Sequence, residues 1–388
     1  METVPRHVLP VLVTAQFAGT SLWFAVNAVM PDLQRELGWT DAAVGTLTSA
    51  LQSGFIVGTL VFALLAVADR FSPRRVFLWC SLAGALCTVG AWSAVRHFDA
   101  LMAWRFATGF FLAGIYPVGM KIAAQWYSRG LGVALGLLVG ALVVGSASPH
   151  ALRAWGDALP WDWLMWAVAA LAAGGGVLLY TLLDDPPGRS TSVVPLRWQA
   201  LAVLWTDRDV RAPVLGYFGH MWELYTVWVM VPLVLATRLD GTAVSLAAFG
   251  VIAAGAIGCV VGGVLATRWG GARVACAQLA CSAACCLLTP WAMEAPDVLF
   301  GAWLLVWGIT VAGDSPQFSA LTARHAPAHM VGSVLTLTNS LGFAISICSM
   351  LWFTHALQWA TLSQLLPWLA LGPMLGLWSM RRLVRDKA

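Results

Sequence analysis

The stretch VADRFSPRRVF, residues 67–77, places four charged side chains within seven residues, between two long apolar runs. A related stretch, LATRWGGARVA, follows at residues 265–275. Residues 68–71 (ADRF) align with residues 266–269 (ATRW) at an offset of 198, and an Arg-Val pair recurs in both copies. A charged loop that recurs at this distance indicates that the chain is built from two halves.

Other segments support the repeat. GVALGLL from Gly132 resembles GSVLTLT from Gly332, and Pro117 and Pro316 lie 199 residues apart. Both charged loops join the second and third apolar run of their half. Two halves of equal topology predict a pseudo-twofold axis along the membrane normal, with a substrate site between the halves.

The composition favours a membrane protein. Of the 388 residues, 60% are hydrophobic and 10% are charged, whereas soluble domains carry roughly 25% charged residues. The net charge is only +4 and the basic residues are spread along the chain, which argues against a nucleic-acid partner. All eight cysteines lie in apolar runs without CxxC spacing, so we expect them to pack, and we expect no metal and no cofactor.

The apolar runs predict an all-α protein with twelve transmembrane helices, because one span needs about 20 apolar residues. The runs cover residues 8–30, 43–67, 75–95, 101–123, 131–152, 162–183, 211–236, 243–266, 273–292, 298–321, 331–354 and 361–380. They form a six-helix half at residues 1–183 and a second at residues 210–388, joined by a cytoplasmic linker at residues 184–209. Within the linker, LRWQALAVLW predicts a short amphipathic helix at the membrane surface.

The basic residues predict the orientation in the membrane. With a cytoplasmic N-terminus, the cytoplasmic side holds 16 Lys and Arg residues, Arg129, Arg189 and Lys387 among them. The opposite side holds 4, which are Arg35, Arg96, Arg153 and Arg238. We therefore expect both termini to lie in the cytoplasm.

These features resemble the major facilitator superfamily of transporters over essentially the whole chain. The family signature between helices two and three runs Gly-x-x-x-Asp-Arg-x-Gly-Arg-Arg. This sequence has Asp69 and Arg70, with Leu65 and Ser72 at the glycine positions and the basic pair one place late. The second copy has Thr267 in place of the acid.

Two further segments carry the resemblance, and one departs from it. The family pattern Arg-x-x-x-Gly of helix four matches Arg105 and Gly109, and the first loop, MPDLQRELGWTDAAVGTLTSA, is also typical of the family. Drug–proton antiporters of the family usually have a Gly-Pro pair in helix five. Here that helix is GLLVGALVVGSASPH, without such a pair, which weakens the interpretation as a drug-efflux carrier without excluding it.

The resemblance implies that helices 1, 4, 7 and 10 line a central cavity. On an ideal helix 1, one stripe holds the polar or aromatic residues Gln16, Thr20, Trp23 and Asn27. We expect this stripe to face the cavity; the alternative is hydrogen bonding between helices.

Helix 4 carries Arg105 and Tyr116 on one face. As a cavity group, Arg105 would bind an anionic substrate or tune a proton site. The alternative is an Arg that snorkels and pairs with a backbone carbonyl.

Ionisable groups inside apolar runs are costly in lipid and are therefore site candidates. His220 and Glu223 lie three residues apart in helix 7, and such a pair can hold one proton between them. The alternative is a structural pair that locks the helix.

The predicted face of helix 10 comprises Trp303, Trp307, Thr310, Asp314 and Gln317. Asp314 precedes Ser315-Pro316, where freed carbonyls could help to bind a cation or a substrate amine, and a structural role is equally open.

The charged loops predict a cytoplasmic gate. Its candidate residues are Asp69, Arg70, Arg74, Arg75, Lys121 and Arg268. The resemblance suggests that Asp69 pairs with the start of helix 11 near Val331, where a carboxylate meets the positive end of the helix dipole. Lys121 either contacts this gate or snorkels to the interface.

We therefore predict a carrier of a bacterial inner membrane that moves a small solute by alternating access, with His220, Glu223 and Asp314 as candidates for proton coupling. We expect it to act as a monomer in the lipid bilayer, and not as an enzyme, because no nucleophile–base set, metal spacing or phosphate loop occurs. The alternatives are an efflux carrier for hydrophobic drugs and a transporter-like sensor or lipid-handling protein without solute flux.

Overall fold

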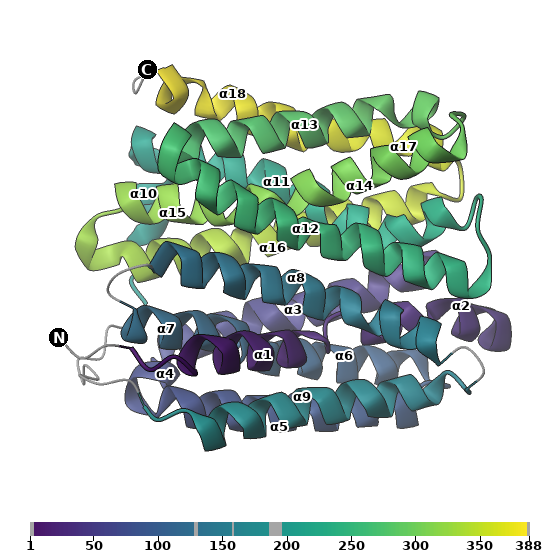
Figure 1. Ribbon diagram of the computed structural model, residues 1–388, viewed down its shortest axis with the longest axis horizontal. Coiled ribbons are helices and arrows are strands. Elements are labelled where there is room, and N and C mark those ends of the chain that lie inside the picture. The colour runs from purple at the N-terminus through teal and green to yellow at the C-terminus, as the bar shows by residue number, and fades with distance from the viewer. Residues whose placement is uncertain (1–3, 128–130, 157–158, 186–195, 386–388) are drawn as a thin grey trace. The chain divides into compact units, whose positions relative to one another are not determined.

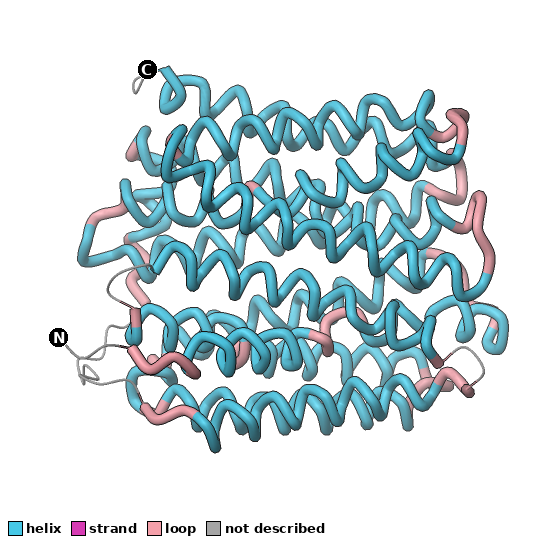
Figure 2. Tube along the Cα trace, viewed as in Figure 1, coloured by secondary structure: helices cyan, strands magenta, loops and turns pink. Residues whose placement is uncertain are grey.

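The computed structural model describes residues 4–127, 131–156, 159–185 and 196–385, and the regular elements within these ranges are all helices (Figures 1 and 2). Arg129, Arg189 and Lys387, which were counted among the predicted cytoplasmic residues, lie outside the described residues. Residues 186–195 of the predicted linker also lie outside them. The chain forms two compact units. Unit 1 comprises Met1–Leu196 and Asp240–Phe249, and unit 2 comprises Arg197–Leu239 and Gly250–Ala388.

The first half of the chain supplies nine helices in its described residues. They are α1 (Val8–Thr20), α2 (Ala25–Leu37), α3 (Ala42–Leu64), α4 (Val67–Arg70), α5 (Pro73–Ser93), α6 (Phe98–Leu112), α7 (Tyr116–Trp126), α8 (Leu131–Trp155) and α9 (Asp162–Leu182). The second half begins with the short α10 (Ala200–Thr206). It continues with α11 (Arg208–Leu235), α12 (Gly241–Trp269), α13 (Gly271–Ala292), α14 (Asp297–Gly313), α15 (Ser315–His325), η1 (Ala328–Met330), α16 (Val331–Ala356), α17 (Leu362–Leu365), η2 (Leu366–Ala370) and α18 (Leu371–Arg385).

Eleven helical segments in the described residues are long and apolar enough to cross a membrane. The twelfth predicted span, residues 361–380, is helical but divided into α17, the 3₁₀-helix η2 and α18. Pro367 stands in the first turn of η2. Proline has no backbone N–H, so it cannot continue the hydrogen-bond ladder of α17. The number of helical segments thus follows the prediction, while the last segment is broken.

Two more predicted spans are interrupted at prolines in matching places. Helix 4 consists of α6 and α7, which starts with Tyr116-Pro117, and helix 10 consists of α14 and α15, which starts with Ser315-Pro316. In helix 10, Pro316 leaves the carbonyl of Ala312 without its usual helical partner. The thiol of Cys259 donates to that oxygen at 3.4 Å, so the freed acceptor is satisfied inside unit 2.

Helix 1 is interrupted without a proline. α1 ends at Thr20 and α2 begins at Ala25. The hydroxyl of Thr20 donates to the carbonyl of Gln16 at 2.8 Å, and the hydroxyl of Ser21 donates to that of Ala18 at 2.7 Å. Such side-chain bonds compete with the backbone ladder. The stripe predicted along helix 1 assumed an ideal helix, and this break divides it, with Gln16 and Thr20 on α1, Trp23 in the break and Asn27 on α2. That the stripe faces a cavity stays a prediction.

Glycines let helices 4 and 10 cross their neighbours at backbone contact. A Cβ atom on Gly109 of α6 would lie 1.8 Å from the carbonyl oxygen of Leu51 on α3. A Cβ atom on Gly308 of α14 would lie 2.1 Å from the carbonyl oxygen of Val251 on α12. Any side chain at either position would force the two helices apart.

The partner helices carry matching glycines. A Cβ atom on Gly58 of α3 would lie 2.4 Å from the carbonyl oxygen of Phe110, and one on Gly258 of α12 would lie 1.9 Å from that of Ile309. The glycines of α6 and α14 are 199 residues apart, and those of α3 and α12 are 200 residues apart. The offset found in the sequence thus recurs as one type of helix crossing in each half of the chain.

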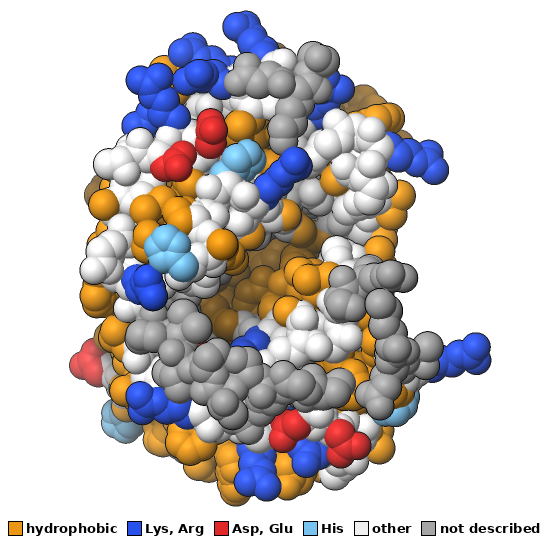
Figure 3. All heavy atoms as spheres, turned by 90° about the vertical axis from the view of Figure 1, so that its left-hand side faces the viewer, with side chains coloured by type: hydrophobic (Ala, Val, Ile, Leu, Met, Phe, Trp, Pro, Cys, Tyr) orange, Lys and Arg blue, Asp and Glu red, His pale blue; other side chains and the backbone are white. Residues whose placement is uncertain are grey.

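Lys and Arg side chains gather on the face drawn in Figure 3, where helix ends and loops reach the surface. The exposed residues among those predicted to be cytoplasmic include Arg70, Arg75, Arg208, Arg268, Arg273, Arg324, Arg381, Arg382 and Arg385. Exposed cations at helix ends are what the positive-inside rule requires. The side of the membrane that they face remains a prediction.

We expect Gly109→Ala to destabilise the protein by about 1–3 kcal/mol, because the new methyl group would overlap the backbone of α3. Gly174→Ala in α9 is the matched control, since a Cβ atom there meets nothing within 4 Å. Thermal unfolding in detergent measures both. Equal melting temperatures would contradict a close crossing of α3 and α6.

Candidate functional site

The buried arginine of helix 4 fills the break in helix 1. Arg105 is fully buried. Its Nη1 donates to the carbonyl of Leu22 at 3.2 Å, and its Nη2 donates to that of Trp23 at 2.6 Å. These carbonyls lie between α1 and α2. A guanidinium can donate to two acceptors at once in a fixed geometry, so Arg105 neutralises the acceptors that the break exposes. The pairing with backbone carbonyls is the alternative stated above, but the side chain is buried instead of snorkelling.

The other candidates of helices 1 and 4 also have neighbours within unit 1. Asn27 donates to Thr48 Oγ1 of α3 at 2.8 Å, and the ring of Trp23 lies 5.1 Å from that of Phe55. Tyr116 is half-buried in the first turn of α7. The contacts of Asn27 and Trp23 connect helix 1 to α3, the second predicted span, as the alternative of contacts between helices describes.

Gln16 is fully buried, and its side-chain amide has no hydrogen-bond partner among the described residues. The amide lies against α7, because a Cβ atom on Gly119 would be 2.1 Å from Gln16 Oε1. The absence of a side chain at Gly119 therefore makes room for the amide inside unit 1.

The predicted gate forms contacts inside unit 1. The ammonium group of Lys121 pairs with the carboxylate of Asp69 and donates to the carbonyl of Ala68 at 2.8 Å. Lys121 thus joins α7 to α4 in the charged loop. The predicted contact of Asp69 with Val331 involves a residue of the other unit and stays a prediction.

Of the four remaining gate candidates, one has polar contacts with a neighbouring helix end and three have exposed side chains. Arg74 donates to the carbonyl of Leu183 at 2.9 Å and lies 3.7 Å from Asp185 Oδ2. It therefore fastens the start of α5 to the end of α9. The side chains of Arg70, Arg75 and Arg268 are exposed.

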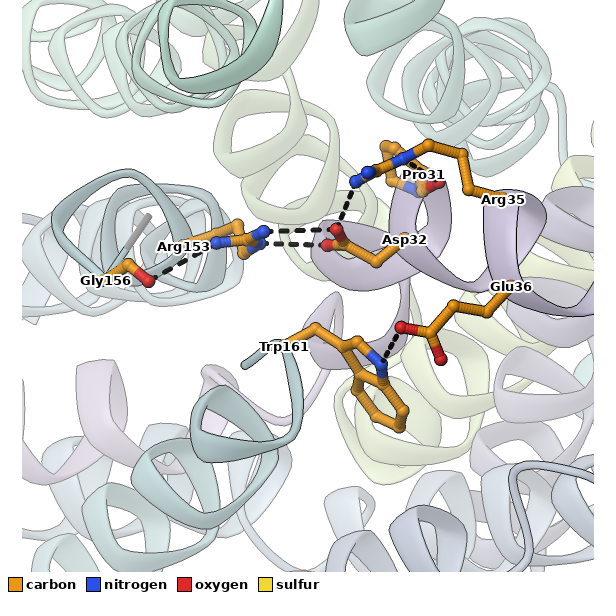
Figure 4. A network of polar contacts seen from close by, with 7 residues as sticks. All are labelled: Pro31, Asp32, Arg35, Glu36, Arg153, Gly156 and Trp161. Atoms are coloured by element: carbon orange, nitrogen blue, oxygen red, sulfur yellow. Dashed lines mark hydrogen bonds and ion pairs between the residues drawn. The ribbon is translucent and has the colours of Figure 1, made fainter. Parts of the chain in front are cut away.

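A cluster at the opposite end of unit 1 was missed by the sequence analysis (Figure 4). Arg153 of α8 binds both carboxylate oxygens of Asp32 on α2, at 2.9 and 3.1 Å, and Arg35 binds the same carboxylate. The side chains of Asp32 and Arg153 are only 10% and 13% exposed. Glu36 accepts from the indole of Trp161 at 3.0 Å. The sequence shows that Arg153 follows an apolar run, but it does not show which acid the chain brings to it.

A buried contact between His220 and Asp314 in unit 2 joins helix 7 to the break in helix 10. His220 Nδ1 lies 2.7 Å from Asp314 Oδ1, and both side chains are 1% exposed. Neither oxygen of Asp314 accepts a well-aligned hydrogen bond within the described residues, and His220 Nε2 has no partner there.

Glu223 forms a separate cluster. Its carboxylate accepts from the indole of Trp307 at 2.6 Å, from the thiol of Cys286 at 3.2 Å and from the hydroxyl of Ser282 at 2.9 Å. The predicted pairing of His220 with Glu223 is thereby corrected. Their spacing places them on one side of α11, but α14 and α15 bring Asp314 to one of them and Trp307 to the other.

The predicted aromatic face of helix 10 also turns toward its own unit. The indole of Trp303 donates to the carbonyl of Cys285 on α13 at 2.9 Å, and the rings of Trp303 and Trp307 lie 5.2 Å apart. Thr310 donates to a carbonyl of its own helix, and Gln317 is buried. Both indole N–H groups are thus engaged inside unit 2, where they fasten α14 to α13 and α11.

The arrangement separates two kinds of buried charge. In unit 1, Arg105 is held by backbone dipoles that do not titrate. In unit 2, Asp314 faces an imidazole, so one added proton on the carboxylate removes the attraction between the two groups. Glu223 is surrounded by neutral donors. The pair of His220 and Asp314 is therefore a place where one proton would change how α11 is held to the break in helix 10.

The chain was compared with known proteins. The family model described as Major Facilitator Superfamily matches residues 12–350. A chloramphenicol resistance protein of Streptomyces lividans is 36% identical over 228 residues, which are 55% of this chain and 54% of that protein. The match thus spans about half the length of this relative.

Solved structures at low sequence identity share the fold. The human organic anion transporter MFSD10 (TETRAN) has a TM-score of 0.72 at 17% identity, with 97% of this chain and 100% of that chain covered. A bacterial homolog of the human lysosomal transporter Spinster has a TM-score of 0.73 at 15% identity, with 98% of each chain covered. The Escherichia coli fucose:proton symporter FucP has a TM-score of 0.69 at 14% identity, covering 98% of this chain and 99% of that one.

We expect Arg105→Lys to lower the free energy of unfolding by about 1–3 kcal/mol, because an ammonium group cannot serve both carbonyls and leaves one buried acceptor unsatisfied. Arg75→Lys makes the same change at an exposed position and should leave stability unaltered. Thermal unfolding of both variants provides the measurement. An unchanged Arg105→Lys protein would show that the carbonyl contacts contribute nothing.

Proposed function

The chain belongs to the major facilitator superfamily, and on that premise we propose that it is a proton-driven carrier that exports an uncharged aromatic solute by alternating access. The observation that carries the coupling is the buried pair of His220 and Asp314, which joins α11 to the break between α14 and α15.

The pair has the properties that a proton switch needs. Both side chains are shielded from solvent, so their electrostatic attraction is stronger than it would be in water. A proton on Asp314 removes that attraction and leaves α11 free to separate from the turn that carries the carboxylate. Pro316 stands in that turn and interrupts the backbone ladder, so the two parts of helix 10 can reorient with little loss of hydrogen bonding.

The buried charged residues Arg105 and Glu223 already have hydrogen-bond partners within the protein, which favours a neutral substrate. Arg105 is bound by two carbonyls and Glu223 by three donors, so binding an ionic substrate at either residue would require breaking existing contacts. The relative described as a chloramphenicol resistance protein points to the same class, because chloramphenicol is an uncharged aromatic amphiphile. This support favours the efflux alternative over the uptake of a small anion.

We expect Asp314→Asn to abolish accumulation driven by a pH gradient, a loss of at least about tenfold, because the variant cannot exchange the proton that alters the pair. The measurement uses radiolabelled chloramphenicol and the full chain in proteoliposomes. Exchange of chloramphenicol at equal pH should persist, since it needs no net proton movement. Asp297→Asn, at a carboxylate that is 93% exposed, serves as the control, and equal gradient-driven transport by all three proteins would refute the coupling.

The substrate class is tested in cells. Expression of the chain in a bacterial host that lacks its own efflux carriers should raise the concentration of chloramphenicol needed to stop growth, and Asp314→Asn should remove that protection at equal expression. Protection that is absent in the wild type would argue against export of this solute. Binding of chloramphenicol by the purified protein without any flux would favour the sensor alternative.

A further inference from the structure

The imidazole of His220 lacks the second polar anchor that usually fixes a histidine ring. Nδ1 faces Asp314, and Nε2 has no partner among the described residues. The contact to Asp314 is short but not well aligned as a hydrogen bond. A ring with one such contact can rotate unless packing prevents it, so the neighbours of His220 determine whether Nδ1 points at the carboxylate.

Two aromatic rings flank the imidazole. Tyr217, one turn earlier on α11, stacks on it with centroids 5.8 Å apart and planes 29° apart. Phe318 of α15 lies 6.5 Å away at 50°. Phe318 is fully buried, and its backbone N–H donates to the carbonyl of Asp314 at 3.1 Å. One turn of helix 10 therefore carries both the carboxylate and one of the two rings that pack on His220.

Each ring rests on a glycine of a neighbouring helix. A Cβ atom on Gly216 of α11 would lie 2.4 Å from Cε1 of Phe318, and one on Gly342 of α16 would lie 2.5 Å from Cε1 of Tyr217. A methyl group at either glycine would push the ring out of its present position. Gly216 therefore leaves room for the ring of Phe318, and Gly342 leaves room for the ring of Tyr217.

We propose that Tyr217 and Phe318 are positioning residues for proton coupling: they form an aromatic clamp, seated on Gly216 and Gly342, that holds the imidazole of His220 toward Asp314. This inference rests on the proposed function of the pair and adds residues that set its geometry. The clamp makes the orientation of His220 depend on the position of α15 and α16, so a movement of either helix releases the imidazole.

Other titratable groups also lie near the pair of His220 and Asp314. The groups that interact electrostatically with Asp314 are Glu223 on α11, Cys259 on α12 and Cys276 on α13. Glu223 accepts from donors on α13 and α14 and not from His220. The experiment must therefore observe the ring of His220 directly.

The test is ¹⁵N nuclear magnetic resonance of the full chain in lipid nanodiscs, with ¹⁵N-labelled histidine and with His220→Gln to assign the signal. We expect one set of His220 ring signals in the wild type, because the clamp keeps the ring in one orientation. Phe318→Leu and Gly216→Ala should lose that single set, through a second set or through broadening, because the ring gains a second orientation. Gly342→Ala reaches the clamp from the side of Tyr217 and should act likewise if the other variants do not fold.

Phe353→Leu is the matched control, because Phe353 is equally buried in unit 2 but packs on Trp222 and Trp352. It should keep the wild-type His220 signal while losing similar packing. Unchanged His220 signals in all folded clamp variants would overturn the proposal. This readout needs no substrate, so failure of proton-driven chloramphenicol transport by the wild type would count against the proposed function and not against the clamp.

Discussion

Backbone groups freed by a broken helix must find partners inside a membrane protein, because lipid supplies none. Within the described residues, that constraint accounts for two of the buried polar contacts. The break in helix 1 exposes the carbonyls of Leu22 and Trp23, and Arg105 satisfies both. The proline break in helix 10 frees the carbonyl of Ala312, which accepts from Cys259. Arg105 is consequently a part of the scaffold of unit 1, and its charge is directed at the backbone.

The two halves repeat their packing but not their polar chemistry. Glycine crossings and proline breaks recur at offsets of 199 and 200 residues, since both halves need their helices to approach closely at the same places. The residue 199 positions before Asp314 is Ile115, an apolar side chain. The contact of a histidine with a carboxylate at a helix break is thus a feature of unit 2. The glycines are kept in both halves because the close helix crossings need them. A polar side chain at a helix break can differ between the halves, because it does not alter those crossings.

The sequence predicted the helices well and their partners poorly. Apolar runs of sufficient length identify spans, and the repeat and the charged loops indicated the family. The error at His220 arose because a spacing of three residues describes neighbours on one helix and carries no information about the helices packed against it. Glu223 is closer in sequence to His220 than Asp314 is, yet Asp314 pairs with it. Similarly, the pairing of Asp32 with Arg153 spans 121 residues, a separation at which periodicity predicts nothing.

By itself, the sequence determined the membrane environment, the twelve helical segments, the repeat of two halves and the residues that lipid makes costly to bury. These properties follow from composition and local pattern, where each residue contributes independently of distant ones. Only the tertiary structure decided that Arg105 caps a broken helix, that Glu223 is enclosed by neutral donors and that His220 faces Asp314 between two aromatic rings. Such contacts depend on distances between helices, and those distances are set by close packing at a few glycines whose neighbours a linear pattern does not reveal.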